Sequence, residues 1–250
     1  PHIDQYDVFI IQGMGSRRWR VGDKLPMRQF CPHPALLHVD PFPPIIDEDL
    51  QPGDILYIPP GFPHDGITHE TALNYSVGFR GPNGRDLISS FADYVLENDL
   101  GGEHYSDPDL TCREHPGRVE EYELERLRTM MIDMIRQPED FKQWFGSFVT
   151  TPRHELDIAP AEPPYEEEEV VDALLGGEKL SRLSGLRVLH IGDSFFVHSE
   201  QLDTTDAEAL DALCRYTSLG QEELGSGLQN QAFVSELTRL INQGYWYFEE

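Results

Sequence analysis

The sequence contains little cysteine and no long apolar segment. Its 250 residues include three cysteines, Cys31, Cys112 and Cys214, which are widely separated and form no C-x-x-C pair. This spacing disfavours a zinc or redox motif, and we expect buried, reduced thiols, as in a cytoplasmic protein. No apolar run approaches the roughly 20 residues that span a bilayer. We therefore expect no membrane partner.

Basic residues are also scarce. The chain has 19 Lys and Arg against 45 Asp and Glu, a formal net charge of −26. Nucleic acids and anionic membranes repel such a surface, whereas a basic protein is attracted to it. Residues 153–250 are the most acidic part, because 6 basic and 20 acidic residues give a charge of −14. We expect a basic protein partner and no direct DNA binding.

Two short motifs contain a possible set of metal ligands. His2 and Asp4 form an H-x-D at the start of the chain, and His64 ends the proline-rich run 51–64. In an extended segment, side chains two residues apart share a face, so the first two can converge and His64 can supply a third ligand. Two imidazoles and one carboxylate form the facial triad of non-haem Fe(II) oxygenases. An H-x-D alone is a weak signal, because short motifs occur by chance.

A positive charge is predicted to point toward the interior near these motifs. Alternation in the run 17–21 places Arg17 on the same face as Trp19. A buried guanidinium is costly without an anion, so we expect a carboxylate or a bound ligand beside it. In a later strand, alternation places Asn74 and Ser76 on a small polar face. That face resembles the lining of a polar pocket.

The hydrophobic period changes along the chain and indicates four parts. Residues 1–82 are predicted to be mostly strand, and residues 83–152 have a helical period. Residues 153–169 are an acidic, Pro- and Glu-rich linker, and residues 170–250 mix helices with a hairpin. The many apolar side chains on the few short helices of the second part favour a dimer. The Met and aromatic stripes of these helices are more simply packing than a cofactor site.

Taken together, the motifs resemble a known family. They resemble the JmjC-type 2-oxoglutarate oxygenases of the bacterial ribosomal oxygenase group, the YcfD type, and the resemblance covers essentially the whole chain. The segments that carry it are residues 2–7, residues 8–12, Arg17, residues 53–64, residues 74–80 and Gly244-Tyr245-Trp246.

The resemblance implies an α+β architecture. A double-stranded β-helix (JmjC/cupin-like) catalytic core would occupy residues 1–82, followed by a helical dimerisation region at 83–152. A winged-helix domain would form the C-terminal part at 170–250, and its acidity favours a protein contact over DNA. The family has a long N-terminal part, whereas this chain begins one residue before the first histidine. We therefore expect the core to lack its N-terminal part here.

The resemblance also implies a reaction. With Fe(II) and 2-oxoglutarate, the family hydroxylates an arginine side chain of a large-subunit ribosomal protein and releases succinate and CO2. The implied protein is a cytoplasmic homodimeric dioxygenase with no catalytic residue beyond its metal centre. The residues assigned to iron are His2, Asp4 and His64, and those assigned to 2-oxoglutarate are Arg17, Ser76 and Asn74.

Two other functions stay open. The chain could be a non-catalytic acidic module that holds a basic ribosomal partner, in which case partner binding would be indifferent to iron. It could also be a cupin-like small-molecule dioxygenase or isomerase. In that second case Arg17 would have no required oxo acid to bind.

Overall fold

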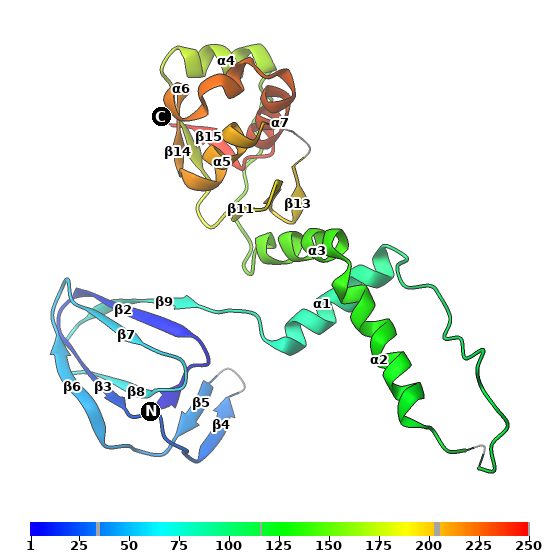
Figure 1. Cartoon of the computed structure of the whole chain (residues 1–250). Coiled ribbons are helices and arrows are strands. Elements are labelled where there is room, and N and C mark those ends of the chain that lie inside the picture. The colour runs from blue at the N-terminus through cyan, green and yellow to red at the C-terminus, as the bar shows by residue number, and fades with distance from the viewer. Residues whose placement is uncertain (34–35, 116, 203–205, 250) are drawn as a thin grey trace. The chain divides into compact units, whose positions relative to one another are not determined.

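The computed structural model describes residues 1–33, 36–115, 117–202 and 206–249. The chain divides into two compact units, residues 1–87 and 88–250, whose elements are labelled in Figure 1. Within the described residues, no helix is both long enough and apolar enough to cross a membrane. The four-part division predicted from the sequence stays a prediction.

The first unit consists of two antiparallel sheets. Six strands form one sheet in the order β4-β5-β1-β8-β3-β6, and three strands form the other in the order β7-β2-β9. Figure 1 shows β2, β7 and β9 as one layer and β3, β6 and β8 as the facing layer. The strands are β1 His2–Ile3, β2 Asp7–Met14, β3 Arg17–Gly22, β4 Gln29–His33, β5 Leu36–Val39, β6 Pro44–Leu50, β7 Ile55–Ile58, β8 Pro63–Thr68 and β9 Leu73–Phe79.

Alternating side chains fill the space between the two sheets. Every second residue from Val8 to Gln12 in β2 is buried, and Trp19 and Val21 are buried in β3 with Arg17 half-buried on the same side, because successive side chains of a strand point to opposite faces. The inward face predicted for the run 17–21 is therefore confirmed. The buried core residues are Val8, Ile10, Trp19, Val21, Leu56 and Ile58.

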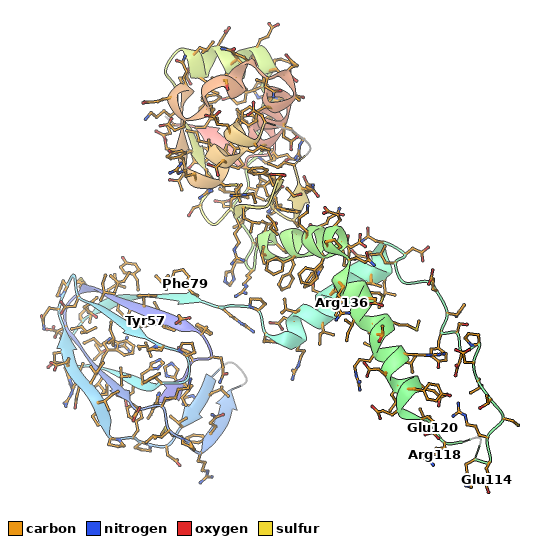
Figure 2. The ribbon with its side chains drawn as sticks, viewed as in Figure 1. Tyr57, Phe79, Glu114, Arg118, Glu120 and Arg136 are labelled. Carbon is orange, nitrogen blue, oxygen red and sulfur yellow. The ribbon has the colours of Figure 1, made fainter. Side chains whose placement is uncertain are left out.

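The outer face of the three-stranded sheet is apolar and exposed. Phe9 stacks on Tyr57 with ring centroids 4.8 Å apart, and it lies edge-on to Phe79. Figure 2 labels Tyr57 and Phe79 on this sheet. Within β9, only Asn74 of the small polar face is partly buried. The exposed fractions are Ile55 63%, Tyr57 47%, Leu73 47%, Tyr75 56%, Val77 41% and Phe79 60%.

The second unit begins with three helices, of which two pack on each other through aromatic rings. These helices are α1 Gly84–Glu97, α2 Glu121–Arg136 and α3 Pro138–Thr150. The Trp144 ring on α3 lies 5.1 Å from that of Phe91 on α1, and its Nε1 donates to Ser90 Oγ at 3.0 Å. Helix α2 has no buried residue. Its apolar stripe is exposed at Leu124, Leu127, Met131 and Ile135.

The remaining elements form a winged-helix unit with its own core, and α3 packs against it. Gly146 on α3 allows a close approach, because a Cβ at this position would lie 2.4 Å from the Phe196 ring on β12. The Ser199 N–H also donates to Thr150 Oγ1 at 3.0 Å. The elements are α4 Glu167–Leu175, β10 Leu180–Arg182, β11 Val188–Ile191, β12 Ser194–Val197, β13 Glu200–Gln201, α5 Ala207–Arg215, β14 Ser218–Leu219, α6 Gln221–Leu224, the 3-10 turn Gly225–Gln229, α7 Gln231–Asn242 and β15 Trp246–Phe248.

The cysteines match the sequence prediction only in part. Cys112 and Cys214 are free thiols, as predicted, but Cys112 is exposed and Cys214 is half-buried. The prediction of burial was wrong for Cys112, because this residue lies on the exposed surface of the loop between α1 and α2. Burial raises the pKa of Cys214 to about 11, so this thiol stays protonated and unreactive. The side chain of Cys31 lies outside the described part of the chain.

Candidate metal centre

Strand pairing places the two predicted histidine ligands directly opposite each other. In the register of β1 and β8, His2 is the partner of His64, and their ring centroids are 4.2 Å apart. Asp4 follows two residues after His2, and the Gly61 N–H donates to its carbonyl at 2.8 Å. The proline-rich turn before His64 thus holds the backbone at Asp4 as well.

The three side chains present their ligand atoms to one point. The Oδ2 of Asp4 lies 3.4 Å from Nε2 of His64 and 3.8 Å from Nε2 of His2. All three ligand atoms lie within 4.8 Å of one another. Atoms about 2.1 Å from one ion in adjacent octahedral positions are about 3 Å apart. The observed spacing therefore fits a shared divalent ion that keeps its remaining coordination positions open.

Hydrogen bonding and burial favour the protonation state in which each group can bind a metal. Nδ1 of His64 lies 3.0 Å from the carbonyl oxygen of Phe62, and donation to that oxygen leaves Nε2 free to bind a metal. Burial, followed by the charge of His64, lowers the pKa of His2. The interaction with His64, whose Nε2 lies 3.4 Å from Oδ2, is the main cause of the lowered pKa of Asp4. A neutral imidazole and an ionised carboxylate are the forms that bind metals.

Arg17 lies half-buried on the same inner surface of the sheet. Its Nη1 donates to Oδ1 of Asn74 at 2.6 Å, and its Nη2 donates to the carbonyl of Gly66 at 3.2 Å. Its Cζ lies 4.9 Å from the centroid of the Trp19 ring. Its Nε is buried and has no acceptor among the described residues.

The neighbouring arginines of β3 provide an internal comparison. Arg18 pairs with Asp47 at 2.6 Å, and Arg20 pairs with Asp65 at 3.6 Å. In the described part of the chain, no carboxylate lies within ion-pair distance of Arg17. The anion predicted beside Arg17 is therefore not a protein carboxylate of the described residues. A bound acid fits this position, because it would supply the missing negative charge.

The two polar residues predicted on β9 have different surroundings. Asn74 contacts Arg17 directly, as described above. Ser76 pairs with Ile10 of β2 and shares the inward face by alternation, but it is exposed and makes no hydrogen bond to Arg17 among the described residues. Sequence reasoning missed Gly66, which lies under the guanidinium of Arg17. A glycine inside a strand is a known sign of close approach and could have indicated it.

Two family models match the chain. Residues 1–87 match the JmjC domain, and residues 133–247 match the ROXA-like winged helix. The second match begins before α3, which agrees with the packing of α3 against the winged-helix unit. The expected α+β fold, with a JmjC cupin-like core and a C-terminal winged helix, is confirmed.

Curated relatives belong to the same group. The ribosomal protein uL16 3-hydroxylase of Escherichia coli K12 is 60% identical over 249 residues, which are 100% of this chain and 67% of that protein. A probable ribosomal oxygenase of Haemophilus influenzae is 31% identical over 176 residues, which are 63% of this chain and 42% of that protein. The chain thus spans about two thirds of the length of the first relative and less of the second.

Solved structures agree in fold along the whole chain. The X-ray structure of E. coli YcfD has a TM-score of 0.94 at 60% identity and covers 99% of this chain and 67% of that one. The structure of the E. coli ribosomal oxygenase YcfD with cobalt and 2-oxoglutarate has a TM-score of 0.91 at 57% identity and covers 100% of this chain and 66% of that one. Because all of this chain aligns with the E. coli hydroxylase at 60% identity, the chain belongs to the JmjC ribosomal oxygenase family.

Proposed function

We propose that the chain carries the catalytic site of an Fe(II)- and 2-oxoglutarate-dependent protein hydroxylase. The observation that carries the proposal is Arg17, which is half-buried beside the triad and has no carboxylate partner among the described residues. Arg18 and Arg20 on the same strand both have one. A dicarboxylic oxo acid that bridges the metal and Arg17 accounts for this difference.

Each residue of the site has a defined role in this proposal. His2, Asp4 and His64 hold the iron, and Arg17 binds the distal carboxylate of 2-oxoglutarate with Asn74 fixing its orientation. When bound, iron and the oxo acid supply the oxidation: one atom of O2 enters a C–H bond of the substrate, and the other enters succinate as CO2 leaves. Ser76 is assigned to the same pocket by its place on the inward face of β9.

We further propose an arginine side chain of a large-subunit ribosomal protein as the substrate. The relative at 60% identity is a ribosomal protein uL16 3-hydroxylase, which supports a ribosomal protein as the substrate class. The net charge of −26 supports a basic partner, since complementary charge accelerates association and weakens with salt. A ribosomal protein substrate also favours the cytoplasm as the place of action.

The exposed stripe of α2 supports a homodimer through residues 83–152. Leu124, Leu127, Met131 and Ile135 are each more than two fifths exposed, and a second copy would remove them from water. The winged-helix part, with its charge of −14, is assigned to protein contact and not to DNA.

Mass spectrometry of a ribosomal protein fraction tests the proposal. Incubation with the protein, Fe(II) and 2-oxoglutarate should add one oxygen atom to an arginine residue of one basic protein and should release succinate. His64→Ala should abolish both products. Arg18→Ala serves as the control and should retain both, because Arg18 lies on the exposed side of β3.

Unchanged turnover in His64→Ala would contradict the metal assignment. Partner binding without any succinate would indicate the acidic binding module instead. Succinate formation that no ribosomal protein stimulates would indicate a small-molecule dioxygenase.

A further inference from the structure

The guanidinium of Arg17 does not lie where the strand register alone would place it. In the pairing of β3 with β8, Arg17 is opposite Thr68 and Trp19 is opposite Gly66. The guanidinium nevertheless lies over Gly66: a Cβ on this glycine would be 2.8 Å from Nε and 3.0 Å from Cζ of Arg17. The side chain therefore runs back along β8 toward His64, and it does so because residue 66 has no side chain.

This displacement brings the positive charge closer to the metal ligands. Gly66 follows His64 by two residues and shares its face of the sheet. Two residues of a strand span about 7 Å, so a guanidinium that stayed over Thr68 would lie about 7 Å farther along β8 from His64. The absence of a side chain at Gly66 thus sets how far the Arg17 charge lies from the triad.

Trp19 fills the space beside this charge. Its side chain is 5% exposed, its ring lies 6.3 Å from the ring of His64, and the Cζ of Arg17 lies 4.9 Å from its centroid. Its Nε1, like the Nε of Arg17, is buried without an acceptor in the described residues. The ring packs against the guanidinium and attracts it by a cation–π interaction.

We propose that Gly66 and Trp19 are positioning residues that set the distance from the Arg17 guanidinium to the metal ligands and so select the chain length of the oxo diacid. The inference rests on the proposed function. An acid held by the metal at its 2-oxo end and by Arg17 at its far carboxylate must span this distance. Each added carbon lengthens the acid by one bond of about 1.5 Å, so acids with four, five and six carbons test the spacing.

The test compares three oxo diacids in the Co(II)-loaded protein. Co(II) affinity is followed by visible absorption, and the affinities for oxaloacetate, 2-oxoglutarate and 2-oxoadipate are measured by calorimetry. The unmodified protein should bind the five-carbon acid most tightly. In Gly66→Ala, Co(II) affinity should be unchanged, whereas 2-oxoglutarate should bind about tenfold to a hundredfold more weakly, the effect of losing one charge-assisted hydrogen bond.

The direction of the selectivity change distinguishes positioning from a general structural defect. The new methyl group displaces the guanidinium toward Thr68, away from His64, so Gly66→Ala should come to favour the six-carbon acid. Gly81→Ala is the matched control, because a Cβ on Gly81 meets nothing within 4 Å. Trp19→Phe, which leaves a smaller ring, should reduce the differences between the affinities for the three acids. This variant decides the question if Gly66→Ala does not fold.

Two results would overturn the inference in distinguishable ways. If Gly66→Ala or Trp19→Phe keeps the affinities and the preference of the unmodified protein, the positioning role is wrong while the proposed function stands. If the unmodified Co(II)-loaded protein binds none of the three acids, the proposed function itself is wrong.

Discussion

Replacing Arg17 with alanine is the most direct test of how the site binds its cosubstrate. The side chain bridges the two sheets through Asn74 and Gly66 and has no carboxylate partner among the described residues. A carboxylate bound there would receive charge-assisted hydrogen bonds worth about 1.5–3 kcal/mol each. Because Arg17 is only half-buried, we take the low end of this range for two bonds. The expected loss is about 3 kcal/mol, or roughly a hundredfold in Kd.

Arg17→Ala should affect the stability of the ligand-free protein and that of the ligand-bound protein differently. Without ligand, Arg17→Ala should unfold at the same temperature as the unmodified protein or higher, because a half-buried cation without an anion is unfavourable. With 2-oxoglutarate and Co(II), the unmodified protein should gain stability by mass action, and Arg17→Ala should gain little at the same concentration. Calorimetric titration measures the change in Kd, and thermal unfolding with and without ligand measures the change in stability.

Arg18→Ala is the matched control for this experiment. Arg18 is the next residue on β3 but pairs with Asp47 on the exposed side, where ion pairs contribute little to stability. Its 2-oxoglutarate affinity should equal that of the unmodified protein. An unchanged Kd in Arg17→Ala would refute the assignment of Arg17, whatever the control does.

Three further predictions concern the second unit. Gly146→Ala should destabilise it by about 1–3 kcal/mol, measured by urea unfolding, because the new Cβ meets the Phe196 ring; equal stability would contradict this packing. Arg113 lowers the pKa of Glu123 to about 2, below its ordinary 4.5, so this pair stabilises the fold above pH 4.5 and loses its effect as the pH falls toward 2. Glu123→Gln should flatten the decline of unfolding free energy over that pH interval, and an equally steep decline would contradict the pairing. If the proposed dimer forms through α2, light scattering should show that Leu127→Arg is a monomer while its circular dichroism stays native, whereas a persisting dimer would place the interface elsewhere.

Part of the candidate metal site could be predicted because it depends on local geometry. His2 and Asp4 share a face by strand alternation alone, and the prolines before His64 are stiff in any fold. The inward direction of Arg17 followed from the same rule, as did its need for an anion. These predictions needed only that the segments be extended.

The helical part shows where local patterns stop being informative. The periodicity of residues 83–152 predicts helices with Met and aromatic stripes, yet Trp144 on α3 is buried and α2 has no buried residue. The difference comes from partner surfaces: Trp144 of α3 packs on Phe91 and Ser90 of α1, and Gly146 of α3 packs on β12. A helical period identifies the apolar stripe of a helix but does not identify what covers it.

Alternation and composition were thus sufficient to predict that His2 and Asp4 share a face, that Arg17 points inward and that an acidic surface favours a basic partner. The tertiary structure decided the rest: the register of β1 and β8 places His2 opposite His64, the packing of the two sheets brings Asn74 to Arg17, and the missing side chain at Gly66 admits the guanidinium. The physical reason is that alternation assigns each side chain to a face of its own strand. Which side chains meet on that face depends on the register between strands far apart in the sequence.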